Sequence, residues 1–338
     1  MIRIGQIFYK RIMRNNLTIV MYHFVRDLSH SRYPQIKGLD ISLFKGQLAY
    51  LQHYYKFVTR EEVIEALEGG NELPDKAVLL TFDDAYIDHY TNIFPLLDEF
   101  GIQGSFFPPV KAITCNEVLD VNKIHFILAS ASDIPSLVEA VYHSLDQYRA
   151  EFGLLDNHYY FEKLAQPSRM DPAEVIFIKR LLQCELDTNI RGVIVDDLFR
   201  AFVGIPEKAF SRELYMNVDQ IKTMLRHGMF IGSHGYDHVW LATLGKKDKE
   251  AEIDQSLEFL DHIGVGLKRW VMCYPYGNYD SELEGILSTR NCSLGLTTEV
   301  AIARIEPGQR YRIPRIDTND LPKQANASPN QFYENLIN

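Results

Sequence analysis

The sequence predicts an α/β fold with parallel strands, interrupted by a helical insertion. In the first third of the chain, short apolar runs alternate with amphipathic helical segments, a pattern typical of parallel strands joined by helices. Between about residues 113 and 212, helical patterns follow one another with almost no strand-like run, and the alternation returns from residue 213. Hydrophobic residues make up 46% and charged residues 24% of the 338 residues, a globular balance that supports a sizeable core.

Strands are predicted where a short apolar run leads into a turn or a helix start. The runs LTIVMYHF at Leu17–Phe24 and AVLLTF at Ala77–Phe82 are typical of buried strands. Further strands are expected at Gln103–Phe107, Met229–Ile231, Trp270–Tyr274 and Leu294–Thr297, and within Arg310–Asp317.

Helices are predicted from their start and stop signals. Thr59 and Glu62 have the spacing of a capping box, while Ser42, Asp171 and Asn217 are expected to start further helices. These signals, together with apolar spacing, predict helices over 42–53, 59–69, 89–100, 135–148, 172–186, 191–202, 217–227 and 248–263.

These patterns divide the chain into four parts. We expect a basic N-terminal segment at 1–16, an α/β portion made of 17–112 and 213–322, a helical insertion at 113–212, and a C-terminal tail at 323–338. The insertion would be a lid, a docking surface, a contact in a homo-oligomer, or only a stabilising addition.

Charge and cysteine spacing limit the partners and the compartment. A formal charge of -10 argues against nucleic acid or an anionic membrane as the main partner. The four cysteines show no CxxC spacing, so we interpret them as free thiols in a reducing compartment. The apolar run at Leu17–Val25 is too short to span a bilayer and lacks the features of a secretory signal. A cytoplasmic location is therefore expected, with a peripheral membrane contact through residues 2–14 as an additional hypothesis.

Two adjacent carboxylates follow one buried strand. Asp83 and Asp84 come directly after the run at Ala77–Phe82, and functional residues of parallel α/β folds gather at that end of the strands. The pair alone decides little, because one Asp could cap the next helix while the other is solvated.

Two imidazoles follow another strand. His234 and His238 are four residues apart, so they would face the same way if this segment made one helical turn. One carboxylate and two imidazoles make a three-ligand metal site with open positions, the pattern of a catalytic metal. A second carboxylate beside it would be free to act as a general base. The same ligands could hold iron for oxygenase chemistry, but that chemistry has no need of the second Asp.

Two other positions are candidates. The segment Tyr274–Asp280 contains a rigid Pro-Tyr-Gly turn, whose backbone N–H groups could donate to an oxyanion or form an ordinary turn. His23 lies near the end of the first apolar run, between Tyr22 and Phe24, where an isolated histidine is more often a core residue than a catalyst.

Taken in order, three segments resemble the polysaccharide deacetylase family, the carbohydrate esterases that share the NodB homology domain. They are Thr81-Phe82-Asp83-Asp84, His234-Gly235-Tyr236-Asp237-His238, and Tyr274-Pro275-Tyr276-Gly277 followed by Asn278-Tyr279-Asp280. The resemblance implies an irregular (β/α)7 barrel of the NodB type, and it does not extend to the insertion.

The resemblance also implies a role for each motif residue. Asp83 would be the catalytic base, while Asp84, His234 and His238 would bind a divalent metal, with Zn²⁺ as the default ion. The backbone N–H of Tyr276 would help to hold the oxyanion.

Two departures from the family pattern concern the remaining groups. Cys273 stands where many members have an Arg that orients the catalytic Asp, and no His follows His262, although many members take their general acid from a late His. The segment Met21–Val25 resembles the branch that deacetylates poly-N-acetylglucosamine, whose acid histidine comes from an early strand. On that basis His23 inherits the acid role, and Arg315, similar to a late Arg-Ile segment of that branch, is expected to replace the orienting Arg.

The expected activity is metal-dependent hydrolysis of an N-acyl group, with acetyl expected, from an amino sugar in surface-glycan or polysaccharide biosynthesis. The substrate would be nucleotide-linked, lipid-linked or an oligosaccharide. Two alternatives stay open: a non-catalytic, metal-stabilised glycan-binding protein, and a hydrolase of a non-sugar amide or formamide.

Overall fold

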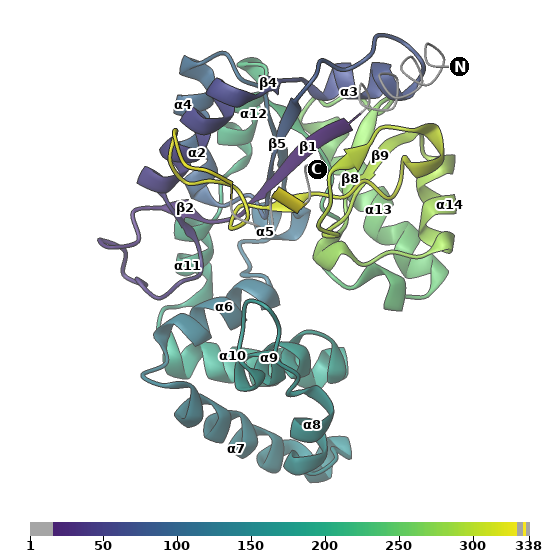
Figure 1. The fold of residues 1–338 in the computed structure, drawn as a ribbon. Coiled ribbons are helices and arrows are strands. Elements are labelled where there is room, and N and C mark those ends of the chain that lie inside the picture. Colours follow the sequence, from purple (N-terminus) through teal and green to yellow (C-terminus); the bar gives the residue numbers. More distant parts are fainter. Residues whose placement is uncertain (1–15, 330–333, 336–338) are drawn as a thin grey trace. The chain divides into compact units, whose positions relative to one another are not determined.

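A computed structural model describes residues 16–329 and 334–335 (Figure 1). Its strands are β1 (Asn16–Tyr22), β2 (Val25–Arg26), β3 (Leu39–Asp40), β4 (Lys56–Phe57), β5 (Ala77–Asp83), β6 (Gly104–Phe107), β7 (Phe230–Ile231), β8 (Trp270–Cys273), β9 (Cys292–Leu296), β10 (Ala303–Arg304) and β11 (Ile316–Asp317).

The α-helices are α2 (Ile41–Tyr54), α3 (Arg60–Leu67), α4 (Phe94–Glu99), α5 (Val110–Thr114), α6 (Asp120–Ser130), α7 (Ile134–Phe152), α8 (Asn157–Leu164), α9 (Ala173–Arg180), α10 (Thr188–Phe202), α11 (Glu207–Leu214), α12 (Val218–Arg226), α13 (Lys246–His262) and α14 (Ser281–Thr289). The short helical turns are η1 (His89–Ile93) and η2 (Leu181–Glu185), both π-helical, and η3 (Leu241–Thr243), η4 (Pro275–Gly277) and η5 (Pro307–Gln309), which are 3₁₀.

The main sheet has the order β10-β1-β5-β6-β7, with β11 also paired to β1 and β4 to β5. All of these pairings are parallel except that of β10 with β1. β8 and β9 form a separate parallel pair. Single parallel bridges join Ser233 to Met272 of β8, and Leu296 of β9 to Ile313. The predicted α/β class with parallel strands is therefore confirmed.

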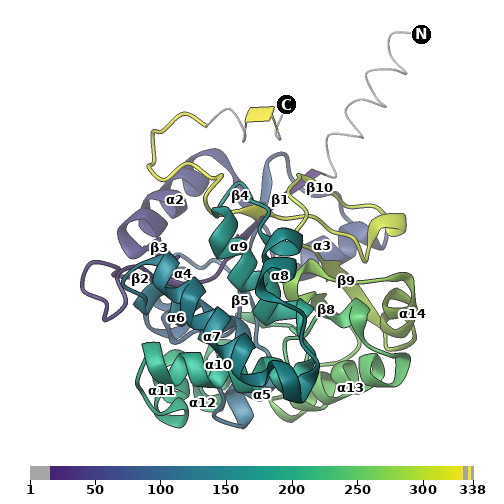
Figure 2. The ribbon, with the colours of Figure 1, turned by 90° about the horizontal axis from the view of Figure 1, so that it is seen from below.

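The chain forms two compact units. The first contains residues up to 27, 38–115 and those from 212 onward, and therefore holds every strand of the sheet. The second contains residues 28–37 and 116–211. In the first unit, α13 and α14 lie beside one another next to the β8–β9 pair (Figure 2).

Alternate residues of β5 pack into two different cores. Val78, Leu80 and Phe82 belong to a core that also contains residues of α2, α4, α12, α13 and α14, whereas Leu79 belongs to a second core. Because successive side chains of a strand point to opposite faces, Asp83 continues the face of Leu79. That second core also contains residues of five other strands, β1, β6, β7, β8 and β9: Ile19, Phe107, Phe230, Val271, Cys273, Leu294 and Leu296.

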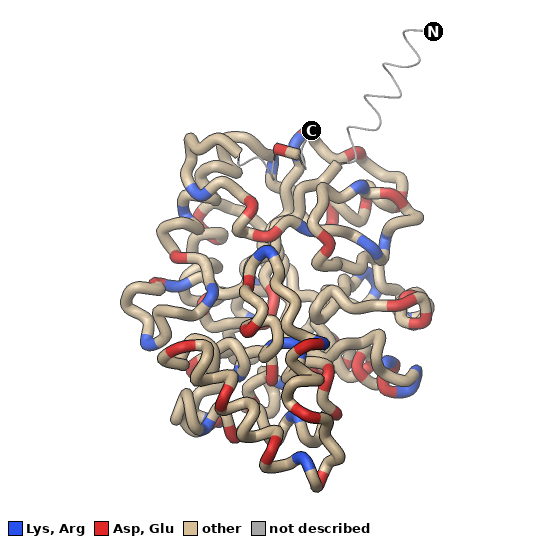
Figure 3. The backbone as a smooth tube through the Cα atoms, turned by 60° about the horizontal axis from the view of Figure 1, so that its bottom comes forward, with Lys and Arg blue, Asp and Glu red and all other residues tan. Residues whose placement is uncertain are grey.

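Helices alone build the regular structure of the second unit. Its longest helix, α7, is held by Asp133, which accepts from the Ser136 N–H at the N-cap, and it ends at Gly153 in the left-handed conformation. Figure 3 shows acidic residues along several of these helices. Two of them, Asp196 and Glu207, contact the buried Lys123 ammonium at 2.5 and 2.8 Å. Burial alone would lower the pKa of Lys123, but these carboxylates outweigh it and raise that pKa.

Two expected caps are wrong. Asp40, not Ser42, caps α2, because the Asp40 carboxylate accepts from the Ser42 N–H at 2.8 Å. The N-cap position of α9 is Pro172 with no side-chain cap, and Asp171 instead accepts from Lys179 at 2.7 Å. The distant ammonium offers Asp171 a charge-assisted partner, which a backbone N–H cannot match.

The expected basic helix at residues 2–14 lies outside the described residues, as does part of the expected tail at 323–338. Among the described residues, no helix is both long and apolar enough to cross a membrane.

The capping box at Thr59 predicts a stability effect. The Thr59 hydroxyl accepts from the Glu62 N–H at 3.2 Å, and Glu62 accepts from the Thr59 N–H at 2.7 Å. Thr59→Ala should therefore lower the free energy of unfolding by about 1 kcal/mol, measured by urea denaturation. Thr59→Ser keeps the hydroxyl and serves as the control, and equal stability of both variants would contradict the capping role.

Candidate metal centre

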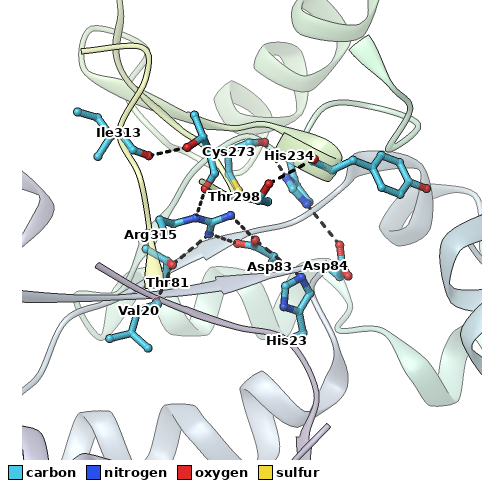
Figure 4. Close-up of polar contacts among 12 residues, drawn as sticks. Val20, His23, Thr81, Asp83, Asp84, His234, Cys273, Thr298, Ile313 and Arg315 are labelled. Atoms are coloured by element: carbon cyan, nitrogen blue, oxygen red, sulfur yellow. Dashed lines mark hydrogen bonds and ion pairs between the residues drawn. The ribbon is translucent and has the colours of Figure 1, made fainter. Parts of the chain in front are cut away.

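The predicted functional side chains lie in the first unit, and Figure 4 shows His23, Asp83, Asp84, His234 and Arg315 close together. His23 follows β1, the two Asp residues lie at the end of β5, and His234 follows β7, whereas Arg315 precedes β11. Asp83 is the last residue of β5, and Asp84 follows it with a φ of 73°. His234 follows β7 by way of the bridge at Ser233. Parallel strands bring these ends to one edge, which is why residues far apart in the sequence meet here.

Asp84, His234 and His238 form a buried group that could hold a cation. One carboxylate oxygen and two ring nitrogens from these residues lie within 4.8 Å of one another. Asp84 Oδ1 is 3.4 Å from His234 Nε2 and 3.3 Å from His238 Nε2. This oxygen is buried and has no hydrogen-bond partner among the described residues. Because a buried polar atom is costly without a partner, its position between two imidazole nitrogens fits a ligand atom.

Neighbouring groups form hydrogen bonds with the atoms of His234 and Asp84 that face away from the cluster. His234 Nδ1 lies 2.7 Å from the Cys273 carbonyl oxygen and donates to it, so His234 Nε2 keeps its lone pair for a cation. The Tyr86 hydroxyl donates to Asp84 Oδ2 at 2.7 Å, which leaves Asp84 Oδ1 facing the imidazoles. Oxygen and nitrogen donors from three side chains, held in this way, fit a divalent ion such as zinc.

The two imidazoles do not lie on a helical turn, so that expectation is wrong. Residues 234–238 form an irregular loop, in which Gly235 has a φ of 73° and His238 a φ of 51°. Buried Glu252 of α13 holds the loop, since its Oε2 accepts from the N–H groups of Tyr236 and Asp237 at 2.9 and 3.0 Å. The role of Glu252 was not predicted, because a carboxylate within a regular amphipathic helix carries no motif.

Asp83 is paired with Arg315 rather than with the histidine cluster. Arg315 Nη1 is 2.9 Å from Asp83 Oδ1, and Arg315 Nη2 is 2.8 Å from Asp83 Oδ2. Thr81 Oγ1 and the Thr297 carbonyl also accept from the guanidinium, at 3.1 and 2.9 Å. Burial alone would raise the pKa of Asp83, but the Arg315 cation outweighs it and lowers that pKa to about 2. The carboxylate is therefore ionised at neutral pH.

A second group of potential ligand atoms combines Asp83, His234 and Cys273. Both oxygens of Asp83 already accept from the Arg315 cation, which would repel a metal ion placed there. Burial also raises the pKa of the Cys273 thiol, which disfavours the thiolate that binds metals. The arrangement therefore favours the group centred on Asp84.

His23 lies at the open side of the pair. Its Nε2 is 4.0 Å from Asp83 Oδ2, and its side chain is 42% exposed, against 2% for Asp83. The residue follows the last residue of β1. His23 is therefore not a core histidine, and its imidazole can meet both the buried carboxylate and a molecule arriving from solvent.

Tyr276 lies beside the histidine cluster in η4, with a φ of 57°. Its ring meets the His238 ring edge to face at 4.8 Å, and it stacks on Trp240 with an interplanar angle of 16°. Gly277 is needed after it, because a Cβ there would lie 2.1 Å from Thr298 Oγ1. Trp240 was not predicted, since an isolated Trp carries no motif. The role of the Tyr276 N–H at an oxyanion stays a prediction.

The family model described as polysaccharide deacetylase matches residues 70–148 and 207–293. The poly-beta-1,6-N-acetyl-D-glucosamine N-deacetylase of Escherichia coli (strain K12) is 36% identical over 88 residues, which are 25% of this chain and 13% of that protein. The match thus spans about an eighth of that relative's length. The YxkH protein of Bacillus subtilis (strain 168) is 19% identical over 321 residues, covering 95% of this chain and 77% of that protein.

Two solved structures share the fold. The deacetylase PplD of Streptococcus pyogenes, in complex with acetate, has a TM-score of 0.54 and 19% identity, and the match covers 95% of this chain and 98% of that chain. IcaB from Ammonifex degensii has a TM-score of 0.53 and 20% identity, covering 90% of this chain and 92% of that one. The family match places the chain in the polysaccharide deacetylase family, and part of the chain is similar to a poly-N-acetylglucosamine deacetylase.

Proposed function

We propose that this protein is a metal-dependent N-deacetylase that removes the acetyl group from an N-acetylated amino sugar of a glycan. The observation that carries the proposal is the juxtaposition of two buried groups. Asp84, His234 and His238 converge within 4.8 Å, while Asp83 lies next to them and is held by Arg315 instead. The Asp84 carboxylate is thereby available to bind a cation, and the Asp83 carboxylate is available to accept a proton.

Asp84, His234 and His238 would hold the metal, with Zn²⁺ as the proposed ion because it accepts mixed oxygen and nitrogen ligands. A divalent ion bound there would polarise the amide carbonyl and lower the pKa of water. Three protein ligands leave coordination positions open for such chemistry.

Asp83 is the proposed general base. A base must be ionised at the working pH, and the Arg315 cation keeps the pKa of Asp83 at about 2. The two parallel hydrogen bonds at 2.9 and 2.8 Å also fix the plane of the carboxylate. Asp83 would accept the proton of the attacking water, and Arg315 would orient it without touching the substrate.

His23 is the proposed general acid, and Tyr276 the proposed oxyanion donor. An amine is a poor leaving group unless it is protonated, so amide cleavage needs a proton donor on the leaving side. His23 is exposed enough to reach such a group and lies 4.0 Å from Asp83. The N–H of Tyr276 would support the oxyanion, since the ring of the same residue contacts His238.

The alternatives differ in what the site should do. Cys273 in place of the usual Arg supported a non-catalytic glycan-binding protein, but Arg315 supplies the guanidinium to Asp83 here. A hydrolase of a non-sugar amide or formamide would use the same groups, so only the choice of substrate separates it from a sugar deacetylase. Oxygenase chemistry gives no role to the Asp83–Arg315 pair.

We also propose a barrel architecture, a class of substrate, a location in the cell and an oligomeric contact. Bridges at Ser233–Met272 and Leu296–Ile313 support an irregular (β/α)7 barrel closed by β8 and β9. The substrate would be an oligosaccharide, or a nucleotide-linked or lipid-linked sugar handled in the cytoplasm, near a membrane. A homo-oligomer would form through the helical unit.

A substrate panel tests the activity. Acetate should be released from N-acetylated oligosaccharides or sugar nucleotides, and a chelator should abolish the release until Zn²⁺ is restored. Formamides and simple acetamides serve as comparison substrates. Release from these compounds alone would favour the non-sugar hydrolase, and binding of glycans without any release would favour the non-catalytic alternative.

The Asp83→Asn variant tests whether Asp83 acts as a general base or as a metal ligand. The variant should keep its zinc, since Asp83 is outside the ligand group, while kcat falls at least about a hundredfold through loss of the base. Metal content by mass spectrometry and acetate release are measured on the same sample. An empty metal site in Asp83→Asn would reassign the residue as a ligand.

Asp84→Ala, unlike Asp83→Asn, should lose zinc. Loss of a ligand should weaken zinc affinity by more than the about 10–100-fold typical of losing a neighbouring partner, as measured by calorimetric titration. Asp237→Asn is the matched control, because this residue belongs to the same cluster of motifs but pairs with Lys111 at 3.0 Å. Equal zinc affinity of both variants would contradict the assignment.

A further inference from the structure

The segment that carries His23 is held by side chains rather than by the main sheet. We call residues 23–26 the acid segment. β1 ends at Tyr22, and β2, which follows, pairs only with the two residues of β3. The Phe24 carbonyl accepts from the Leu39 N–H at 2.9 Å. The carbonyls on either side of Phe24, those of His23 and Val25, have partners in the segment around η1.

Asp88 and Asn92 bind the distal part of the acid segment. Asp88 receives two hydrogen bonds from the Arg26 guanidinium, at 2.8 and 2.9 Å, and one from the Val25 N–H at 3.2 Å. Asn92 Nδ2 donates to the Val25 carbonyl at 2.8 Å. These contacts fix Val25 and Arg26 but not the residue that carries the imidazole.

His89 contacts that residue itself. Its side chain is fully buried, and its Nε2 lies 2.9 Å from the His23 carbonyl oxygen. Since a carbonyl can only accept, the proton of His89 is on Nε2, and Nδ1 has no hydrogen-bond partner among the described residues. Burial lowers the pKa of His89 to about 4, so the ring is neutral at physiological pH.

The ring of His89 is itself wedged between aromatic side chains. Its centroid lies 5.6 Å from that of Phe82 and 5.7 Å from those of Tyr86 and Phe106. Tyr86 also stacks on Phe24 at 3.7 Å and donates to Asp84. The neutral His89 ring thus connects the backbone of His23 to Tyr86, which in turn contacts Asp84.

We propose that His89 is a positioning residue for His23, and that its Nε2–H bond to the His23 carbonyl holds the imidazole where it can protonate the leaving amine. The inference rests on the proposed function. The His23 side chain is 42% exposed and packing alone does not fix it, so its placement depends on its backbone. A displacement of about 1 Å at a catalytic group costs about a hundredfold in rate.

The test compares amide and ester hydrolysis by the full-length, zinc-loaded protein. His89→Phe keeps an aromatic ring but removes the donor, whereas His89→Gln keeps a side-chain N–H. His89→Phe should lower kcat on an N-acetylated oligosaccharide about ten- to a hundredfold, with KM and zinc content unchanged. Hydrolysis of 4-nitrophenyl acetate should change less than about twofold, because its leaving group needs no proton. His89→Gln should recover most of the amide activity.

Two further variants separate positioning from a general structural role. His23→Ala should show the same loss of amide but not ester activity, and adding His89→Phe to it should cost little more, since both changes act on one group. Thr91→Ala is the control, because Thr91 is exposed in the same turn and its hydroxyl donates to the Ile87 carbonyl instead. Parallel loss of amide activity, ester activity and zinc in His89→Phe would overturn the proposal, as would unchanged amide turnover.

Hydrogen exchange keeps the test independent of the proposed activity. The peptide covering residues 22–27 should exchange faster in His89→Phe than in the wild type and Thr91→Ala, while peptides around residues 234–238 should not change. Faster exchange would support the positioning contact even if the wild type released no acetate, a result that would refute only the deacetylase proposal. Unchanged exchange would overturn the positioning role whatever the activity.

Discussion

The buried ion pair of Asp83 with Arg315 is the interaction on which the site depends. A carboxylate without exposure to water would ordinarily take up a proton, and a protonated Asp83 could not act as a base. Two hydrogen bonds from one planar guanidinium keep it charged and oriented. With Asp83 so engaged, Asp84 is the carboxylate left to face the imidazoles, and the adjacent residues acquire different chemistry.

The residues around the site also fix which atom of each functional residue faces the cluster. The Cys273 carbonyl sets the tautomer of His234, Tyr86 occupies one oxygen of Asp84, and Glu252 holds the loop that carries both imidazoles. The first two partners engage the ligand residues' other polar atoms, and Glu252 fixes the backbone of the loop. Asp88, His89 and Asn92, in and beside η1, likewise hold the acid segment by hydrogen bonds to its backbone.

Much of the fold could be predicted, because strands buried on both faces have continuous apolar sequences. β5 lies within one residue of its expected ends, whereas β1 ends two residues before the expected Phe24. The candidate site followed from motifs at strand ends. The loop at 234–238 could not be predicted, because spacing alone cannot distinguish a helical turn from a loop held by a distant carboxylate. The helices α5, α6, α8, α11 and α14 were not predicted either. α14 has a side-chain cap from Asp280, whereas Leu119 at the N-cap position of α6 offers none.

The partners of the central pair are 232 positions apart in the chain. During synthesis, β1, β5 and β6 leave the ribosome long before the segment that bears the guanidinium, so the emerging sheet holds an uncompensated negative charge at its functional edge. Until that segment arrives, burying Asp83 is unfavourable, and protonation or solvation competes with closure of the core. Burial of this edge of the sheet is consequently expected to be a late event in the synthesis of the protein.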